Sequence, residues 1–185
     1  MHGKSIALKM PLVAKPGPAS DAASESREAS LKPAATDFEL IELLFFAYRD
    51  FVGEPDRLLE RHSFGRAHHR VLHFVNRHQG LNVAELLDIL EITKQSLARV
   101  LKDLIHAGFI EQQAGAEDRR QRLLFLTTRG KDLADALAGM QAHRMRRALG
   151  AAGMESRPVI ARFLSALIDH ERIKARDGTT EGEAS

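Results

Sequence analysis

The stretch Thr93–Gly130, TKQSLARVLKDLIHAGFIEQQAGAEDRRQRLLFLTTRG, determines how the rest of the chain is interpreted. Thr93 is suited to cap a helix, because its hydroxyl can accept a hydrogen bond from the amide of Ser96. Apolar residues then recur at helical spacing and form one stripe, which is typical of an amphipathic helix packed on a core. These residues are Leu97, Val100, Leu101, Leu104 and Ile105. Gly108 ends the predicted helix.

Two strand candidates follow this helix and are joined by a charged loop. Phe109–Gln112 is the first strand and Arg122–Thr127 the second. The connecting loop, AGAEDRR at residues 114–120, contains Asp118 and two adjacent arginines. Asp118 is placed to hold the loop in shape by pairing with a nearby arginine or by capping backbone amides. The stretch therefore predicts a helix followed by a basic β-hairpin, which is the order found in a winged helix-turn-helix.

The exposed face of the predicted helix carries polar and basic side chains that suit DNA. Side chains near the N-terminal end of a recognition helix reach base edges in the major groove. Gln95 can pair with adenine and Arg99 with guanine or a phosphate, whereas Lys102 is expected on a phosphate. A surface helix with a solvated basic face would show the same pattern, so the helix alone does not decide between the two interpretations.

The arginines of the loop favour the DNA-binding interpretation. A purely structural hairpin would gain little from arginines at a solvent-exposed tip, whereas the negative potential of the minor groove attracts guanidinium groups. Residues 92–131 contain eight Arg or Lys against four Asp or Glu, and residues 38–91 contain six against nine. Positive charge therefore gathers at the helix and loop, and we predict double-stranded DNA as the partner. The predicted DNA-binding residues are Thr93, Lys94, Gln95, Ser96, Arg99, Lys102, Arg119 and Arg120, with Asp118 stabilising the wing.

Two further helices are predicted just before this one. The first spans about Gly65–Arg77 and stops at Gly80, and the second spans Val83–Leu90. A tight turn at Glu91-Ile92 then leads into Thr93, a spacing that suits a helix-turn-helix. The residues predicted to face inward from the first of these helices are Phe64, Ala67, Val71, Phe74 and Val75.

Longer helices are predicted towards both ends of the chain. Asp37 is expected to cap a helix that ends at Gly53-Glu54-Pro55, and apolar residues surround this helix almost completely. Lys131–Ala148 and Pro158–Ala175 are predicted as two more helices, separated at Gly150–Gly153. One small domain offers them few apolar partners, so together these helices predict the interface of a homodimer.

The predicted organisation is one domain between two tails. Residues 1–36 and 177–185 lack apolar periodicity and are predicted to be disordered. Residues 37–176 form the domain, in which 37–64 and 132–176 serve mainly dimerisation and 65–131 form the winged helix-turn-helix lobe. The predicted fold class is mainly α with a small β-hairpin wing (α+β), flanked by N- and C-terminal dimerisation helices.

The sequence resembles the MarR family of dimeric winged helix-turn-helix regulators. That family carries Asp-x-Arg in the wing, then Leu-Thr six residues later, then a Gly that opens the next long helix. The matching residues here are Asp118, Arg120, Leu126, Thr127 and Gly130, and Leu104 and Gly108 match the end of the recognition helix. The resemblance covers about Asp37–Ala175 and is strongest over Ile92–Gly130. The run FGRAHHRVLHFVNRHQG, which begins at residue 64, also resembles the PetP-type subgroup.

This resemblance implies a two-fold dimer on a pseudo-palindromic operator, with repression commoner than activation. It also implies a small-molecule effector bound between the dimerisation helices and the DNA-reading lobe. A constitutive or architectural DNA-binding protein without an effector is the alternative. Thermal stabilisation by a metabolite, together with loss of operator binding, would separate the two.

Five histidines crowd the segment from His62 to His78. His69 and His73 stand at i and i+4, a spacing that can chelate a metal. The sequence places no further ligand beside them and the flanking arginines would repel a cation, so we predict no metal site. An anionic or aromatic ligand is favoured over a metal, because the segment borders the pocket that the resemblance implies. The residues predicted for it are Arg66, His69, Arg70 and His73; the simpler alternative is a partly buried helix whose imidazoles bond neighbouring groups.

Composition excludes several other classes of protein. The chain has no cysteine, which removes disulfides and thiolate metal sites. No apolar run approaches the ~20 residues of a membrane span, and the first 36 residues lack the apolar core of a signal peptide, so we expect the cytoplasm and no membrane partner. Neither GxxxxGK[ST] nor GxGxxG occurs, and no catalytic grouping stands at a convincing spacing. We therefore predict neither an enzyme nor a cofactor.

Overall fold

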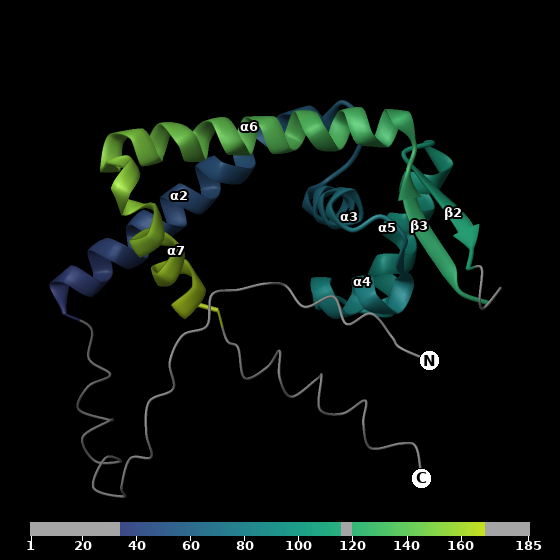
Figure 1. Cartoon of the computed structure of the whole chain (residues 1–185), viewed down its shortest axis with the longest axis horizontal. Helices are drawn as coiled ribbons and strands as arrows, with labels where there is room; N and C mark the ends of the chain where they lie inside the picture. The colour runs from purple at the N-terminus through teal and green to yellow at the C-terminus, as the bar shows by residue number, and fades with distance from the viewer. Residues whose placement is uncertain (1–33, 116–119, 169–185) are drawn as a thin grey trace, which may run out of the picture. The chain divides into compact units, whose positions relative to one another are not determined.

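The computed structural model describes residues 34–115 and 120–168, which fall into two compact units, 34–148 and 149–168 (Figure 1). The first unit contains α2 (Ala35–Glu60), α3 (Arg66–Arg77), β1 (Leu81–Asn82), α4 (Val83–Leu90), α5 (Lys94–His106), β2 (Ile110–Ala114), β3 (Arg122–Leu126) and most of α6 (Thr128–Ala152). The second contains the end of α6, a 3-10 turn η1 (Met154–Ser156) and α7 (Arg157–Ala166). The predicted fold class, mainly α with a small β-hairpin, is confirmed.

The hairpin belongs to a three-stranded antiparallel sheet in the order β1-β3-β2. In the hairpin, Gln112 pairs with Leu124, and on the other side of β3 Leu124 pairs with Leu81. The amide of Gly80 also donates to the carbonyl of Leu124 over 2.9 Å. The sequence did not predict β1, because two residues are too few to show the alternation of a strand.

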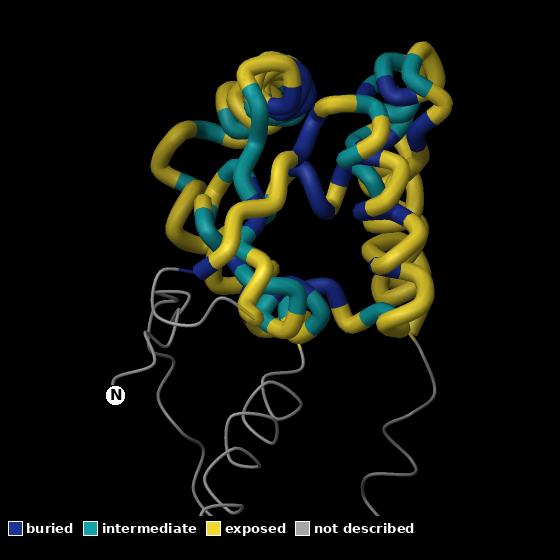
Figure 2. Tube along the Cα trace, turned by 90° about the vertical axis from the view of Figure 1, so that its right-hand side faces the viewer, coloured by how far each residue is buried: buried dark blue, intermediate teal, exposed yellow. Residues whose placement is uncertain are grey.

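The core lies where α3, α4, α5 and the sheet meet, and buried positions recur between exposed ones along the trace (Figure 2). Its fully buried members include Leu72, Leu86, Leu97, Leu104 and Leu124. Burying one such side chain stabilises the fold by about 1.5–3 kcal/mol. The apolar stripe of α5 is therefore turned into the core, and the opposite face of the same helix is left to solvent.

The first helix differs from its prediction at both ends. It begins at Ala35, so Asp37 stands in its first turn, where its Oδ2 accepts from the amide of Ala34 over 2.8 Å. Gly53-Glu54-Pro55 does not end the helix, because α2 continues to Glu60 with Pro55 inside it. A proline inside a helix costs about 3 kcal/mol. Burial of Val52, Pro55 and Leu59 along one side of α2 offsets that cost.

Other boundaries shift by a few residues. α3 begins at Arg66 with Gly65 as its N-cap, and Ala67, predicted to face inward, is exposed while Leu72 is buried. α6 starts at Thr128 rather than Lys131 and continues through Gly150 until Gly153, whose φ of +86° ends it.

The predicted last helix is also shorter in the structure. α7 ends at Ala166, whereas the prediction extended to Ala175, and residues 169–175 lie outside the described residues. Both predicted tails also lie outside them, apart from residues 34–36. Within the described part of the chain, no helix combines the length and apolar character that a membrane crossing requires.

Candidate nucleic-acid interface

α4 and α5 form the predicted helix-turn-helix, and their ends are fixed by local hydrogen bonds. The side chain of Asn82 caps α4 by accepting from the amides of Ala84 and Glu85, and Glu85 accepts from the amide of Asn82 in return. α4 ends at Leu90, and Glu91 follows it as the C-cap with a φ of +50°, in the left-handed region. The tight turn predicted at this position is confirmed.

Thr93 begins α5 as the sequence predicts. Its Oγ1 accepts from the amide of Ser96 over 3.2 Å and donates to the Ser96 hydroxyl over 2.9 Å. The cap satisfies an amide that the helix itself leaves without a partner. It therefore sets the residue at which the polar face of α5 begins.

The polar face of α5 is exposed along its length. The predicted DNA-binding residues on it, Thr93, Lys94, Gln95, Ser96, Arg99 and Lys102, are all exposed. Within residues 34–115 and 120–168, no acidic group pairs with the basic groups of Lys94, Arg99 or Lys102. This face therefore presents three cationic side chains that can bind an external anion.

The end of α5 is joined to the start of α6 by the residues on which the family resemblance rests. Thr127 Oγ1 donates to the carbonyl of Gly108 over 2.7 Å and accepts from the amide of Gly130 over 3.1 Å. A Cβ at Gly130 would lie 1.9 Å from the carbonyl oxygen of Phe109, so only glycine fits there. These contacts hold the first turn of α6 against the turn that follows the recognition helix.

Arg129 adds a contact that the sequence did not predict. Its guanidinium donates to the carbonyl of Ala107 over 2.8 Å and lies 4.3 Å from the centre of the Phe109 ring. A cation at the C-terminal end of a helix is stabilised by the helix dipole. Arg129, which belongs to α6, therefore holds the C-terminal end of α5 in place.

The hairpin brings basic residues beside α4. The amide of Gly115 donates to the carbonyl of Gln121 over 3.1 Å, and Arg120 is exposed. A recess of about 320 Å³ lies between the hairpin and the start of α4. It is lined by Asn82, Val83, Ala84, Arg120, Gln121 and Arg122. Asp118 and Arg119 lie outside the described residues, so their predicted roles stay predictions.

The four residues predicted to bind a ligand do not all have the same partners within the protein. Arg66 pairs with Asp56 of α2 over 2.9 Å, which raises the pKa of the guanidinium, and Arg70 donates to the carbonyl of Leu90 over 2.6 Å. His69 is buried and lies near Gln141 of α6. Three of the four side chains thus contact three different helices, and the ligand role stays a prediction.

Desolvation lowers the pKa of two histidines of α3, His69 and His73. Burial lowers the pKa of His69, and the charge of His73 lowers it further. The pKa of His73 is lowered by desolvation and then by the charge of Arg77. Among the described residues, no three His, Asp or Glu side chains are grouped so that they could hold a metal ion.

Comparisons with known proteins agree with this geometry. Residues 62–121 match the sequence profile described as MarR family. The chain is 47% identical over 129 residues to the HTH-type transcriptional regulator PetP of Rhodobacter capsulatus. The aligned residues cover 70% of this chain and 78% of the relative.

Solved structures share the fold. The transcriptional repressor CouR, bound to a 23-mer DNA duplex, matches with a TM-score of 0.56 and 20% identity over 78% of this chain and 96% of that one. NadR in complex with 4-hydroxyphenylacetate matches with a TM-score of 0.58 and 20% identity over 74% of this chain and 94% of that one. At such identities the likeness concerns the fold alone.

Proposed function

Because the chain belongs to the MarR family of winged helix-turn-helix transcriptional regulators, we propose that it acts as a homodimeric repressor on a pseudo-palindromic operator. DNA-binding regulation is the activity of the family, and the dimer, the operator symmetry and the repression are the proposal. The relative CouR is described as a repressor bound to duplex DNA, which supports the sign of regulation. The proposed site of action is the cytoplasm.

The exposed cationic face of α5 is the observation that carries this proposal. Gln95 and Arg99 read base edges in the major groove, while Lys94 and Lys102 bind phosphates. The cap at Thr93 presents the first turn of α5 to the groove, because side chains at that end reach the bases.

The hairpin contacts the same duplex beside the recognition helix. Arg120 and Arg119 bind the backbone or enter the minor groove, where the potential is most negative. Arg122 is added to the predicted set, since it lines the recess between the hairpin and α4 together with Arg120.

A second copy of the chain covers the first half of α2. This half is apolar over most of its circumference, with Asp37, Glu39 and Glu42 as its acidic residues, and every large side chain in it is exposed, with Phe45 reaching 67%. Exposed apolar groups on one helix mark a surface that a partner buries. The residues are Phe38, Leu40, Ile41, Leu43, Leu44, Phe45, Phe46 and Tyr48. In the second unit, Val159, Phe163, Leu164, Leu167 and Ile168 are exposed in the same way.

A small effector modulates the proposed repressor. The relative NadR was solved with 4-hydroxyphenylacetate, an aromatic carboxylate. An effector changes DNA affinity only by binding one arrangement of the two reading lobes better than the other. A compound that both raises the melting temperature and releases the operator would identify it; no such compound in a broad panel of metabolites would remove this part of the proposal.

The DNA-binding proposal is tested with a duplex selected by the protein from a random library. Binding is measured by fluorescence anisotropy at several salt concentrations, against a scrambled duplex of equal length. Loss of one base-reading contact weakens binding by about 5- to 150-fold. Arg99→Ala should therefore bind the selected duplex more weakly by a factor in that range and lose its preference at one base pair. Arg120→Ala should weaken both duplexes alike and reduce the salt slope by about 1.

Arg147→Ala is the matched control. Arg147 is an exposed arginine near the far end of α6, away from the hairpin (Figure 1). This variant should bind as the wild type does. Absence of any salt-sensitive binding by the wild-type protein, or equal binding by all three variants, contradicts the proposed interface.

A further inference from the structure

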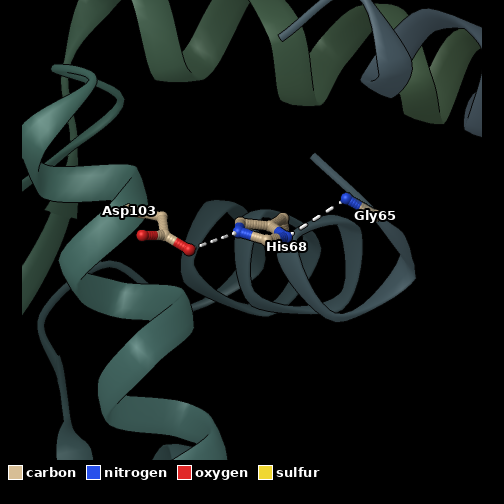
Figure 3. A network of polar contacts seen from close by, with 3 residues as sticks. All are labelled: Gly65, His68 and Asp103. Atoms are coloured by element: carbon tan, nitrogen blue, oxygen red, sulfur yellow. Dashed lines mark hydrogen bonds and ion pairs between the residues drawn. The ribbon is translucent and has the colours of Figure 1, made fainter. Parts of the chain in front are cut away.

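A histidine of α3 connects the start of its own helix to the recognition helix (Figure 3). Nδ1 of His68 accepts from the amide of Gly65 over 3.1 Å, and Nε2 lies 3.4 Å from Oδ2 of Asp103. A backbone amide can only donate, so Nδ1 carries no proton. The proton of the neutral ring is therefore on Nε2, where it is donated to the Asp103 carboxylate.

The ring of His68 is held in place by more than these two bonds. It stacks on Phe64 with the ring centres 4.7 Å apart and the planes 12° from parallel. Phe64 in turn meets Phe109 edge to face at 5.2 Å. Phe109 is the ring over which Arg129 lies. The side chain of His68 is only 14% exposed. It therefore packs on the pair of rings, Phe64 and Phe109, that also contacts the end of α5.

Asp103 is an unusual residue for the helix that reads DNA. Its carboxylate is 47% exposed and would repel phosphates. It also follows Arg99 by four residues, the spacing at which opposite charges pair along a helix. Asp103 contacts His68 instead, and Arg99 remains exposed. The contact with α3 thus determines whether the Asp103 carboxylate pairs with His68 or with Arg99.

We propose that His68 is a positioning residue for DNA reading: it holds Asp103 against α3, and thereby keeps the carboxylate from neutralising Arg99. This inference rests on the proposed function, because it assumes that Arg99 binds DNA. The link also fixes the rotation of α5 about its own axis, since it joins the exposed side of that helix to α3.

His68→Glu separates the positioning role from the capping role. A glutamate three residues after the N-cap can still accept from the cap amide, as Glu85 does at the start of α4, so the start of α3 is preserved. A carboxylate has no proton to donate and repels Asp103, so the link to Asp103 is lost. The freed carboxylate of Asp103 then pairs with Arg99. We expect binding to the selected duplex to weaken by about 10- to 150-fold, the loss that corresponds to one hydrogen bond to a charged group.

The decisive comparison repeats His68→Glu in an Asp103→Asn background. An asparagine has no charge with which to neutralise Arg99, so His68→Glu should cost little affinity for the selected duplex in that background and should leave the preference at the base pair read by Arg99. A merely structural role for His68 predicts the same loss in both backgrounds, because the packing lost with the imidazole does not depend on the charge of Asp103. His62→Glu is the matched control, since His62 also packs against Phe64 and contacts Phe109 but has no bond to Asp103, and it should bind as wild type.

Three outcomes overturn the inference: wild-type binding by His68→Glu, the same loss from His68→Glu in the Asp103→Asn background, or an equal loss in His62→Glu. Each of these leaves the proposed function intact if the wild-type protein still binds the selected duplex in a salt-dependent manner. Failure of the wild type itself to bind removes the proposed function instead. The melting temperatures of all variants, measured in parallel, confirm that binding is compared between folded proteins.

Discussion

Gly130 illustrates what a single residue can and cannot reveal in advance. The sequence identifies it through resemblance to a family, but the reason, a carbonyl oxygen 1.9 Å from where its Cβ would be, depends on how α6 meets Phe109. His68 gave no such signal. Its partner Asp103 is 35 residues away, and nothing in the spacing of either residue predicts that they meet.

His69 is the residue whose titration should affect stability. Burial, and then the charge of His73, lowers its pKa in the folded protein below the ordinary value of about 6.5. The unfolded chain therefore takes up a proton first as the pH falls, and folding is destabilised from about pH 6.5 down to the lowered pKa. His69→Gln should lose less stability between pH 7.5 and ~5 than the wild type, as measured by urea unfolding.

His143→Gln serves as the control for this measurement. His143 is exposed on α6, so the comparison separates the effect of losing a buried imidazole from the effect of replacing any histidine by glutamine. A wild-type curve that coincides with that of His69→Gln would contradict the assignment of this dependence to His69.

At the scale of secondary structure, local signals predicted the elements that carry the site. α4 has its predicted bounds, and α5 begins at its predicted cap, because capping and helical periodicity act over a few residues. Pro55 misled the prediction for α2, since burial of the next turn outweighs the local preference of proline. β1 exists only through its pairing with β3, which is a contact distant in sequence.

Thr93 offers a test of the link between a cap and the helix it begins. Thr93→Ala removes the acceptor for the amide of Ser96, and loss of an N-cap costs about 1 kcal/mol. Chemical denaturation should show this loss. Thr93→Ser keeps the hydroxyl and should recover most of the stability. A fully stable Thr93→Ala protein would show that the cap does not stabilise α5.

For the whole molecule, the exposed apolar half of α2 makes the oligomeric state the central question. Phe45 is the most exposed large apolar residue described, at 67%. Burying a charge without a partner in an apolar interface is strongly unfavourable. Phe45→Glu should therefore convert the proposed dimer to monomer in sedimentation velocity and reduce operator affinity, since a monomer spans only one half-site.

Gln112→Glu is the control for the added charge. Gln112 is exposed on β2, at the opposite end of the first unit from the start of α2 (Figure 1). This variant should sediment as the wild type does. A Phe45→Glu protein that remains dimeric would place the interface elsewhere on the molecule.

β3 is tied on both edges, by β2 on one side and by β1 and the amide of Gly80 on the other. The stem of the hairpin is thereby held to the connection between α3 and α4, and its strands cannot shift in register without breaking hydrogen bonds on both edges of β3. A change in the length of the loop between Gly115 and Arg120 should therefore leave the paired strands in register, and with them the position of α5.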